Sequence, residues 1–127
     1  MAGLKLDGAG QAKLKTLEEA GTMIQRVHGL VEKYALAIKR QTPPGTFFMN
    51  LKRQLPALAG LLKGQFGMIA DQVLAMNLAI TRGSSEPNRI RQMREGVALI
   101  TQAIEIAIKQ VIQKHTVPDE QHATHNE

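Results

Sequence analysis

The feature that most constrains the fold is a run of apolar residues, spaced three and four apart, between Asn50 and Thr81. This spacing places the side chains on one face of an α-helix, whereas a strand needs alternation. The run has one irregularity, because two steps of four meet at Leu62 and shift the apolar seam around the helix. The pattern predicts a helix with the seam Leu51, Leu55, Leu58, Leu62, Phe66, Ile69, Val73, Met76 and Ile80.

Two more segments show the same periodicity. Before the central run the seam is Leu17, Ala20, Ile24, Val27, Val31, Tyr34 and Ile38, and after it Ile90, Met93, Val97, Ile100, Ile104, Ala107 and Val111. The prolines of Thr42–Gly45 end the first helix, and Gly83 with the N-cap candidate Ser85 separates the other two. We therefore predict an all-α protein, an antiparallel up-down helical bundle of three long helices.

Pro56 leaves the number of helices open. It lies either in the first turn of the central helix, where a missing N–H does no harm, or at a kink within a longer helix. If the chain breaks near Pro56, the bundle has four helices. Gly60 and Gly64 share one helical face and favour close contact with a neighbouring helix, with a hinge as the alternative.

The chain divides into three regions. We expect residues 1–10 to be a flexible leader, 11–115 the helical bundle, and 116–127 a disordered polar tail. The hydrophobic fraction of 43% suits a folded core, which must be aliphatic because only 3% of the residues are aromatic. No apolar run resembles a signal peptide or a membrane span, so we expect a cytoplasmic protein.

The sequence offers little for catalysis. It contains no Gly-rich phosphate loop, nucleophile elbow or paired-carboxylate motif. His28 is isolated, and His122 and His125 in the tail lack further fixed ligands for a metal. We predict that the protein is not an enzyme and has neither a cofactor nor a metal site.

Positive charge is concentrated in the middle of the chain. The formal net charge is +5, but residues 39–94 hold nine basic and two acidic residues, a local balance of +7. Arg89, Arg91 and Arg94 lie in the first turns of a helix, where the helix dipole disfavours cations, so a functional reason for them is more plausible. The candidate nucleic-acid-binding residues are Lys52, Arg53, Arg82, Arg89, Arg91 and Arg94.

In a three-helix bundle these cations gather at two opposite ends. Lys52 and Arg53 lie at one end with Lys39 and Arg40, and Arg82 lies at the other with the three arginines of the last helix. The alternative is a solvated basic rim that only aids solubility.

Two helices are apolar on more than one face, which predicts self-association. The candidate interface residues are Leu74, Leu78, Ile104, Ile106, Ile108 and Ile112.

The layout resembles that of a known group of proteins. A long first helix is followed by the proline turn Thr42–Gly45, the basic start Leu51-Lys52-Arg53-Gln54-Leu55, and an Arg82-Gly83 turn into an aliphatic helix. This order is similar to that of the small four-helix-bundle proteins that include the accessory variability determinant of diversity-generating retroelements. The resemblance implies a basic homo-oligomer, pentameric in that family, which binds RNA and a reverse transcriptase. A weaker similarity is to the small helical subunits of CRISPR effector complexes.

The predicted function is that of a noncatalytic, self-associating accessory subunit. It binds nucleic acid, RNA more readily than DNA, or helps to assemble a nucleoprotein complex such as one with a reverse transcriptase. The alternative is a structural or adapter protein that binds a partner protein through its apolar helix faces.

Overall fold

The described part of the chain folds into four helices that pack in a ring. The structure, a computed structural model, describes residues 5–82 and 85–117. The helices are α1 (Gly8–Arg40), α2 (Gly45–Leu62), α3 (Gly67–Thr81) and α4 (Glu86–His115). α1 packs against α2 and α4, and α3 packs against the same two helices. The fold is therefore an all-helical bundle, with the four helices that were expected if the central run is broken.

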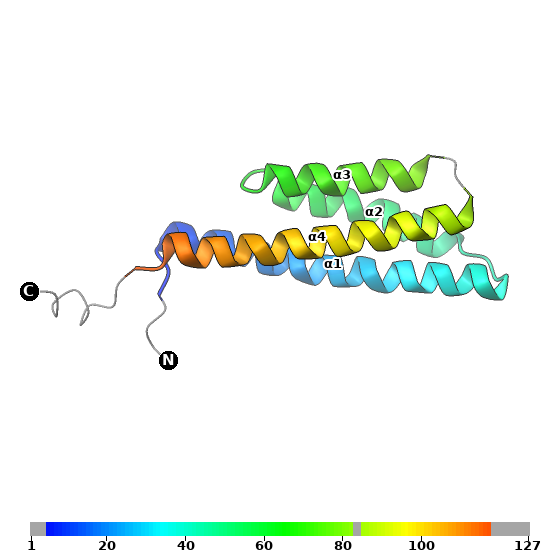
Figure 1. Ribbon diagram of the computed structural model, residues 1–127, viewed down its shortest axis with the longest axis horizontal. Helices are drawn as coiled ribbons and strands as arrows, with labels where there is room; N and C mark the ends of the chain where they lie inside the picture. Colours follow the sequence, from blue (N-terminus) through cyan, green and yellow to red (C-terminus); the bar gives the residue numbers. More distant parts are fainter. Residues whose placement is uncertain (1–4, 83–84, 118–127) are drawn as a thin grey trace, which may run out of the picture.

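The four helices differ in length. α1 and α4 have 33 and 30 residues, and α2 and α3 have 18 and 15. At about 1.5 Å per residue, α1 is about 50 Å long and α2 about 27 Å. The short α2–α3 hairpin lies beside one half of the long α1–α4 pair, and the other half extends beyond it (Figure 1).

The central run breaks where its seam is irregular and not at Pro56. Pro56 lies inside α2 and is exposed, so the break that gives the fourth helix comes after Leu62 and not at Pro56. α2 ends at Leu62, residues 63–65 form the turn, and α3 begins at Gly67. Two successive steps of four shift the apolar face around the helix. A single straight helix would therefore not keep that face against one partner. Folding back lets both halves of the seam face one core.

Close packing does not explain the glycines of this region. A Cβ placed on Gly60 or Gly64 meets no atom within 4 Å, so the expected close helix contact is wrong. Gly64 lies in the turn between α2 and α3.

The three seams form the core. From Leu17 to Tyr34, every residue of the first seam is at most 1% exposed. The seam of α4 is buried from Met93 to Val111, and no charged residue among those described is buried. The periodicity therefore predicted the core correctly.

The residues just before α1 contact the end of α4 and the residue that follows it. Asp7 is the N-cap of α1, and its Oδ1 accepts the Gly10 N–H at 2.7 Å. The same carboxylate lies 3.1 Å from Nδ1 of His115 at the end of α4, and Leu6 forms an antiparallel bridge with Thr116. The hydrogen bond from the Gly10 N–H, and then the contact with His115, hold the pKa of Asp7 below its ordinary value of 3.8. The helix thus begins three residues before the expected start at residue 11; residues 1–4 and 118–127 lie outside the described part.

Gly10 permits the close approach of α4 to α1. A Cβ at this position would overlap the Cβ of His115, which the helix backbone holds in place. We expect Gly10→Ala to lower the free energy of unfolding by about 1–3 kcal/mol, because one helix must move.

The matched control is Gly21→Ala on the same helix, where an added Cβ meets nothing within 4 Å. It should raise the free energy of unfolding by up to about 1 kcal/mol, since alanine is the better helix former. Urea denaturation followed by circular dichroism measures both changes. Equal effects of the two substitutions would show that α1 and α4 do not touch at Gly10.

Candidate nucleic-acid interface

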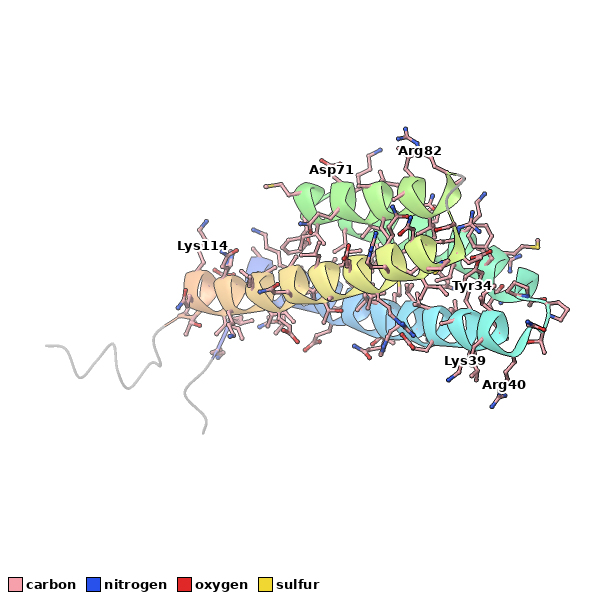
Figure 2. All side chains as sticks on the ribbon, turned by 45° about the vertical axis from the view of Figure 1, so that its right-hand side comes forward. Tyr34, Lys39, Arg40, Asp71, Arg82 and Lys114 are labelled. Carbon is pink, nitrogen blue, oxygen red and sulfur yellow. The ribbon has the colours of Figure 1, made fainter. Side chains whose placement is uncertain are left out.

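The break after Leu62 brings the basic segments together at one end of the bundle. Because α2 and α3 form a hairpin, the start of α2 and the end of α3 lie at the same end, beside the end of α1 and the start of α4 (Figure 1). Lys39, Arg40 and Arg82 are found there, and Lys114 lies at the opposite end (Figure 2). The expected separation of the cations into two opposite ends is therefore wrong.

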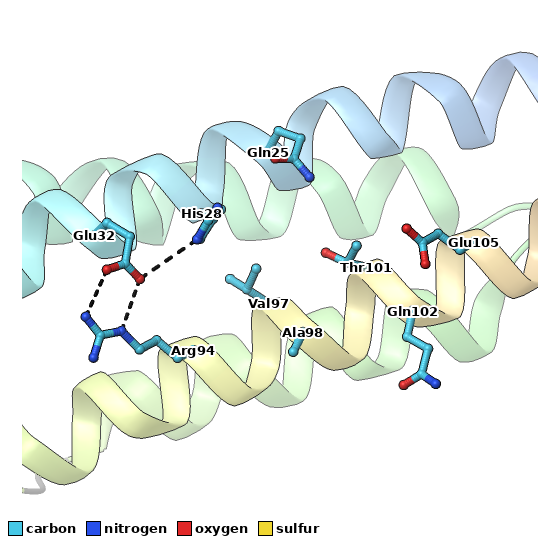
Figure 3. Close-up of a pocket in the computed structure, with 9 residues that line it drawn as sticks. All are labelled: Gln25, His28, Glu32, Arg94, Val97, Ala98, Thr101, Gln102 and Glu105. Atoms are coloured by element: carbon cyan, nitrogen blue, oxygen red, sulfur yellow. Dashed lines mark hydrogen bonds and ion pairs between the residues drawn. The ribbon is translucent and has the colours of Figure 1, made fainter.

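Arg94, a candidate nucleic-acid-binding residue, is engaged by a carboxylate. Its Nε and Nη2 donate to the two carboxylate oxygens of Glu32 at 3.0 and 2.8 Å (Figure 3). These hydrogen bonds hold the pKa of Glu32 below its ordinary value of 4.5 and raise the pKa of Arg94. Both side chains are about half exposed, so the pair adds less than about 1 kcal/mol to stability. Arg94 therefore connects α4 to α1, and we no longer count it among the candidate nucleic-acid-binding residues.

Arg89 is engaged in a cluster of side chains from three helices. Tyr34 of α1 donates its hydroxyl hydrogen to Oε1 of Glu86 at 2.5 Å. Nη1 of Arg89 donates to the Tyr34 hydroxyl at 3.3 Å and lies 3.5 Å from Oε2 of Glu86. The Arg89 guanidinium also covers the ring of Phe48 on α2, 5.1 Å from its centre.

Burial explains why this cluster is structural. Tyr34 is 1% exposed, and this burial, with the hydrogen bond to Glu86, raises the pKa of its hydroxyl. The side chain of Arg89 is only 18% exposed. Arg89 therefore connects the start of α4 to α1 and α2, and we no longer count it among the candidate nucleic-acid-binding residues either.

Six cations remain, which we call the basic end. They are Lys39, Arg40, Lys52, Arg53, Arg82 and Arg91, all exposed. Within residues 5–82 and 85–117, none of the six lies within 4.0 Å of a carboxylate. Arg91 donates to Oδ1 of Asn88 at 2.9 Å and does not pair with Glu95. The basic end therefore keeps its charge available to a polyanion.

A hollow lies between α1 and α4. It has a volume of about 600 Å³, and it is lined by Glu32 beside Arg94 and by Glu105, about three turns further along α4 (Figure 3). Nε2 of His28 lies 3.9 Å from Oε2 of Glu32, which is too long for a hydrogen bond. The hollow between α1 and α4 carries charges of both signs, so it does not extend the basic end. In the part of the chain that the structure covers, no three His, Cys, Asp or Glu side chains are grouped to hold a metal; His122 and His125 lie outside that part.

The candidate interface residues separate by burial. Leu74, Leu78 and Ile106 are 48, 51 and 48% exposed, and Ile108 and Ile112 are half-buried. Ile104 is 3% exposed and belongs to the core of the single chain, so including it was wrong. Sequence reasoning missed Leu99, which is 58% exposed and lies seven residues from Ile106 on the same face of α4.

Comparison of the chain with protein-family models, with curated proteins and with solved structures gave no match. Among the described helices, none is both long and apolar enough to cross a bilayer.

Proposed function

We propose that this protein is a noncatalytic accessory subunit that binds nucleic acid through the basic end, RNA in preference to DNA. The observation that carries the proposal is the gathering of six cations at one end, none with a carboxylate within 4.0 Å among the described residues, whereas glutamates pair with Arg89 and Arg94. Uncompensated cations at one end of the bundle attract a polyanion, and binding releases the counterions of its phosphates.

Recognition through the phosphate backbone fits this surface better than base stacking does. Phe48 lies in the first turns of α2, and Arg89 and Lys52 lie over its ring at 5.1 and 5.8 Å from its centre. A ring used in this way does not offer a free face to a base. The proposed contacts are therefore charge contacts, with little dependence on base sequence.

The resemblance stated above supports RNA as the ligand and a nucleoprotein complex, such as one with a reverse transcriptase, as the setting. That group has four helices, and the division of the central run into α2 and α3 supplies the fourth. The proposal takes these helices as an antiparallel up-down bundle.

The second candidate function is that of an adapter or a self-associating scaffold. Four large apolar side chains favour it, because each leaves about half of its surface in water: Leu74 and Leu78 on α3, and Leu99 and Ile106 on α4. Self-association and nucleic-acid binding are compatible, since repeated basic ends bind a polyanion more tightly than one.

A titration separates the two functions. The full chain is mixed with labelled RNA of generic sequence and with duplex DNA, at about 50 and about 200 mM salt. We expect binding to both at low salt, tighter for RNA, and weaker binding at moderate salt. Sedimentation of the protein alone gives its subunit number. An oligomer that binds neither nucleic acid at low salt would favour the scaffold and refute the proposed function.

A further inference from the structure

A groove between α1 and α2 carries positive charge that the basic end does not include. It has a volume of about 450 Å³ and is lined by Arg26, Gly29, Leu30, Lys33, Asn50 and Gln54. α1 supplies the two cations and α2 the two carboxamides. The groove contains no carboxylate, in contrast to the hollow between α1 and α4.

The two cations of the groove are uncompensated. Arg26 and Lys33 are exposed, and neither has a carboxylate within 4.0 Å among the residues the structure describes. On the opposite wall, Asn50 and Gln54 are four residues apart and share a face of α2. Their carboxamides donate and accept hydrogen bonds, so they suit phosphate and sugar oxygens alike. An anion that enters the groove meets donors on both walls.

The spacing of the cations fits a chain of phosphates better than a single ion. Arg26 and Lys33 are seven residues apart, two helical turns, which is about 10.5 Å along α1. A strand carries one phosphate per nucleotide, so separate phosphates of the same strand can meet the two cations. Arg40 is seven residues further on and continues the line into the basic end.

The floor between the two cations is open at Gly29. A Cβ at this position meets no atom within 4 Å, so Gly29 leaves open space over this turn of α1. A glycine within a helix is destabilising relative to alanine, and at this position its lack of a side chain keeps the groove clear.

From these observations we infer that the α1/α2 groove holds a single strand of nucleic acid, with its phosphates at Arg26 and Lys33, and leads it to the basic end. This inference rests on the proposed function and adds the path of the ligand. We expect duplex DNA, which is wider than a single strand, to be held only at the basic end.

The test uses the full chain and labelled poly(U) RNA of roughly 12 nucleotides. Arg26→Gln with Lys33→Gln should raise Kd by about 10–30-fold near 0.1 M salt and make the slope of log K against log salt shallower by about 1.4. The same double variant should change Kd for duplex DNA by less than about threefold, because its phosphates stay on the basic end.

A glycine pair separates a path for the strand from a general effect of charge. Gly29→Glu places a carboxylate in the groove and should weaken poly(U) binding by at least about tenfold. Gly21→Glu adds the same charge to α1 at a position outside the groove and should change Kd by less than about twofold. Circular dichroism of both variants checks that the helices are intact.

The outcomes distinguish the inference from the proposed function. If the groove variants bind poly(U) like the wild type, whereas neutralising the basic end abolishes binding, the groove is not the path and the proposed function stands. Equal losses with Gly29→Glu and Gly21→Glu would also overturn the inference. If the wild type binds no poly(U) at low salt, the proposed function and the inference fail together.

Discussion

Glutamine replacement of four cations at the basic end is expected to weaken RNA binding by about two to three orders of magnitude near 0.1 M salt. The four substitutions are Lys39→Gln, Arg40→Gln, Lys52→Gln and Arg53→Gln. Each neutralised phosphate contact contributes about 0.7 to the salt slope for a single strand, so four contacts account for about 2.8 logarithmic units at this salt concentration. All four side chains are exposed, so the fold should tolerate the change. Fluorescence anisotropy with labelled RNA measures the affinity.

A matched control keeps the same net charge. Replacing Lys15, Lys63, Lys109 and Lys114 by glutamine also lowers the formal charge from +5 to +1, and these four side chains are exposed away from the basic end. We expect this variant to lose less than about fivefold in affinity, through the weaker general field alone. Equal losses in the two variants would show that overall charge, and not the basic end, binds RNA.

The three arginines at the start of α4 are less suitable for this test. Arg89 contacts Tyr34 of α1 and Phe48 of α2, and Arg94 pairs with Glu32 of α1. Replacing them with alanine together with Arg91 should therefore lower the free energy of unfolding as well as remove charge. Arg91 alone is suitable, since only Asn88 engages it.

Tyr34→Ala is expected to lower the free energy of unfolding by about 3–5 kcal/mol. The ring is 1% exposed and packs against Phe48 at 5.9 Å between ring centres. Its loss leaves a cavity where three helices meet and removes a hydrogen bond from both Glu86 and Arg89. A loss of this size is a large fraction of the roughly 5–15 kcal/mol that stabilises an ordinary domain. Urea denaturation at pH 7 measures it.

One further substitution separates the hydroxyl of Tyr34 from its ring, and another serves as a control. Tyr34→Phe keeps the ring and should cost about 1–2 kcal/mol, because the Glu86 carboxylate loses a buried donor. Leu36→Ala on the same helix should cost less than about 1 kcal/mol, since Leu36 is 43% exposed. If Tyr34→Ala costs no more than Leu36→Ala, the cluster does not join the three helices.

The raised pKa of Tyr34 adds a dependence on pH. The folded state favours the neutral hydroxyl, so this contribution to stability is complete below the unfolded pKa of about 10 and is lost as the pH rises through the raised pKa of the folded state. The wild type should therefore lose more stability above pH 10 than Tyr34→Phe does. Parallel losses in the two proteins would show that the hydroxyl is not buried.

Periodicity predicted which residues form the core but not where the central run turns. The spacing from Leu51 to Ile80 is the same whether the run is one helix or a hairpin, because each half has its own apolar face. The break coincides with the irregular step at Leu62. We expected it near Pro56 instead, because a proline removes a backbone donor. In α2 the ring faces solvent, and the helix continues past it.

The candidate site was harder to predict than the core. The cations were identified by their charge and their place on the helices. Their partners were not identified, because Arg94 pairs with Glu32, and Arg89 with Tyr34, across more than 50 residues of sequence. Arg26 and Lys33 were missed because their groove exists only when α2 lies against α1. The sequence did contain one signal, the spacing of seven from Arg26 through Lys33 to Arg40.

The most direct test of the central claim is the slope of log K against log salt for the wild-type protein and a single-stranded RNA. If the six cations of the basic end each neutralise a phosphate, the slope is about −4 or steeper, and affinity falls by more than about a hundredfold between 50 and 200 mM salt. A slope shallower than about −2, or no binding at about 50 mM salt, would contradict the account.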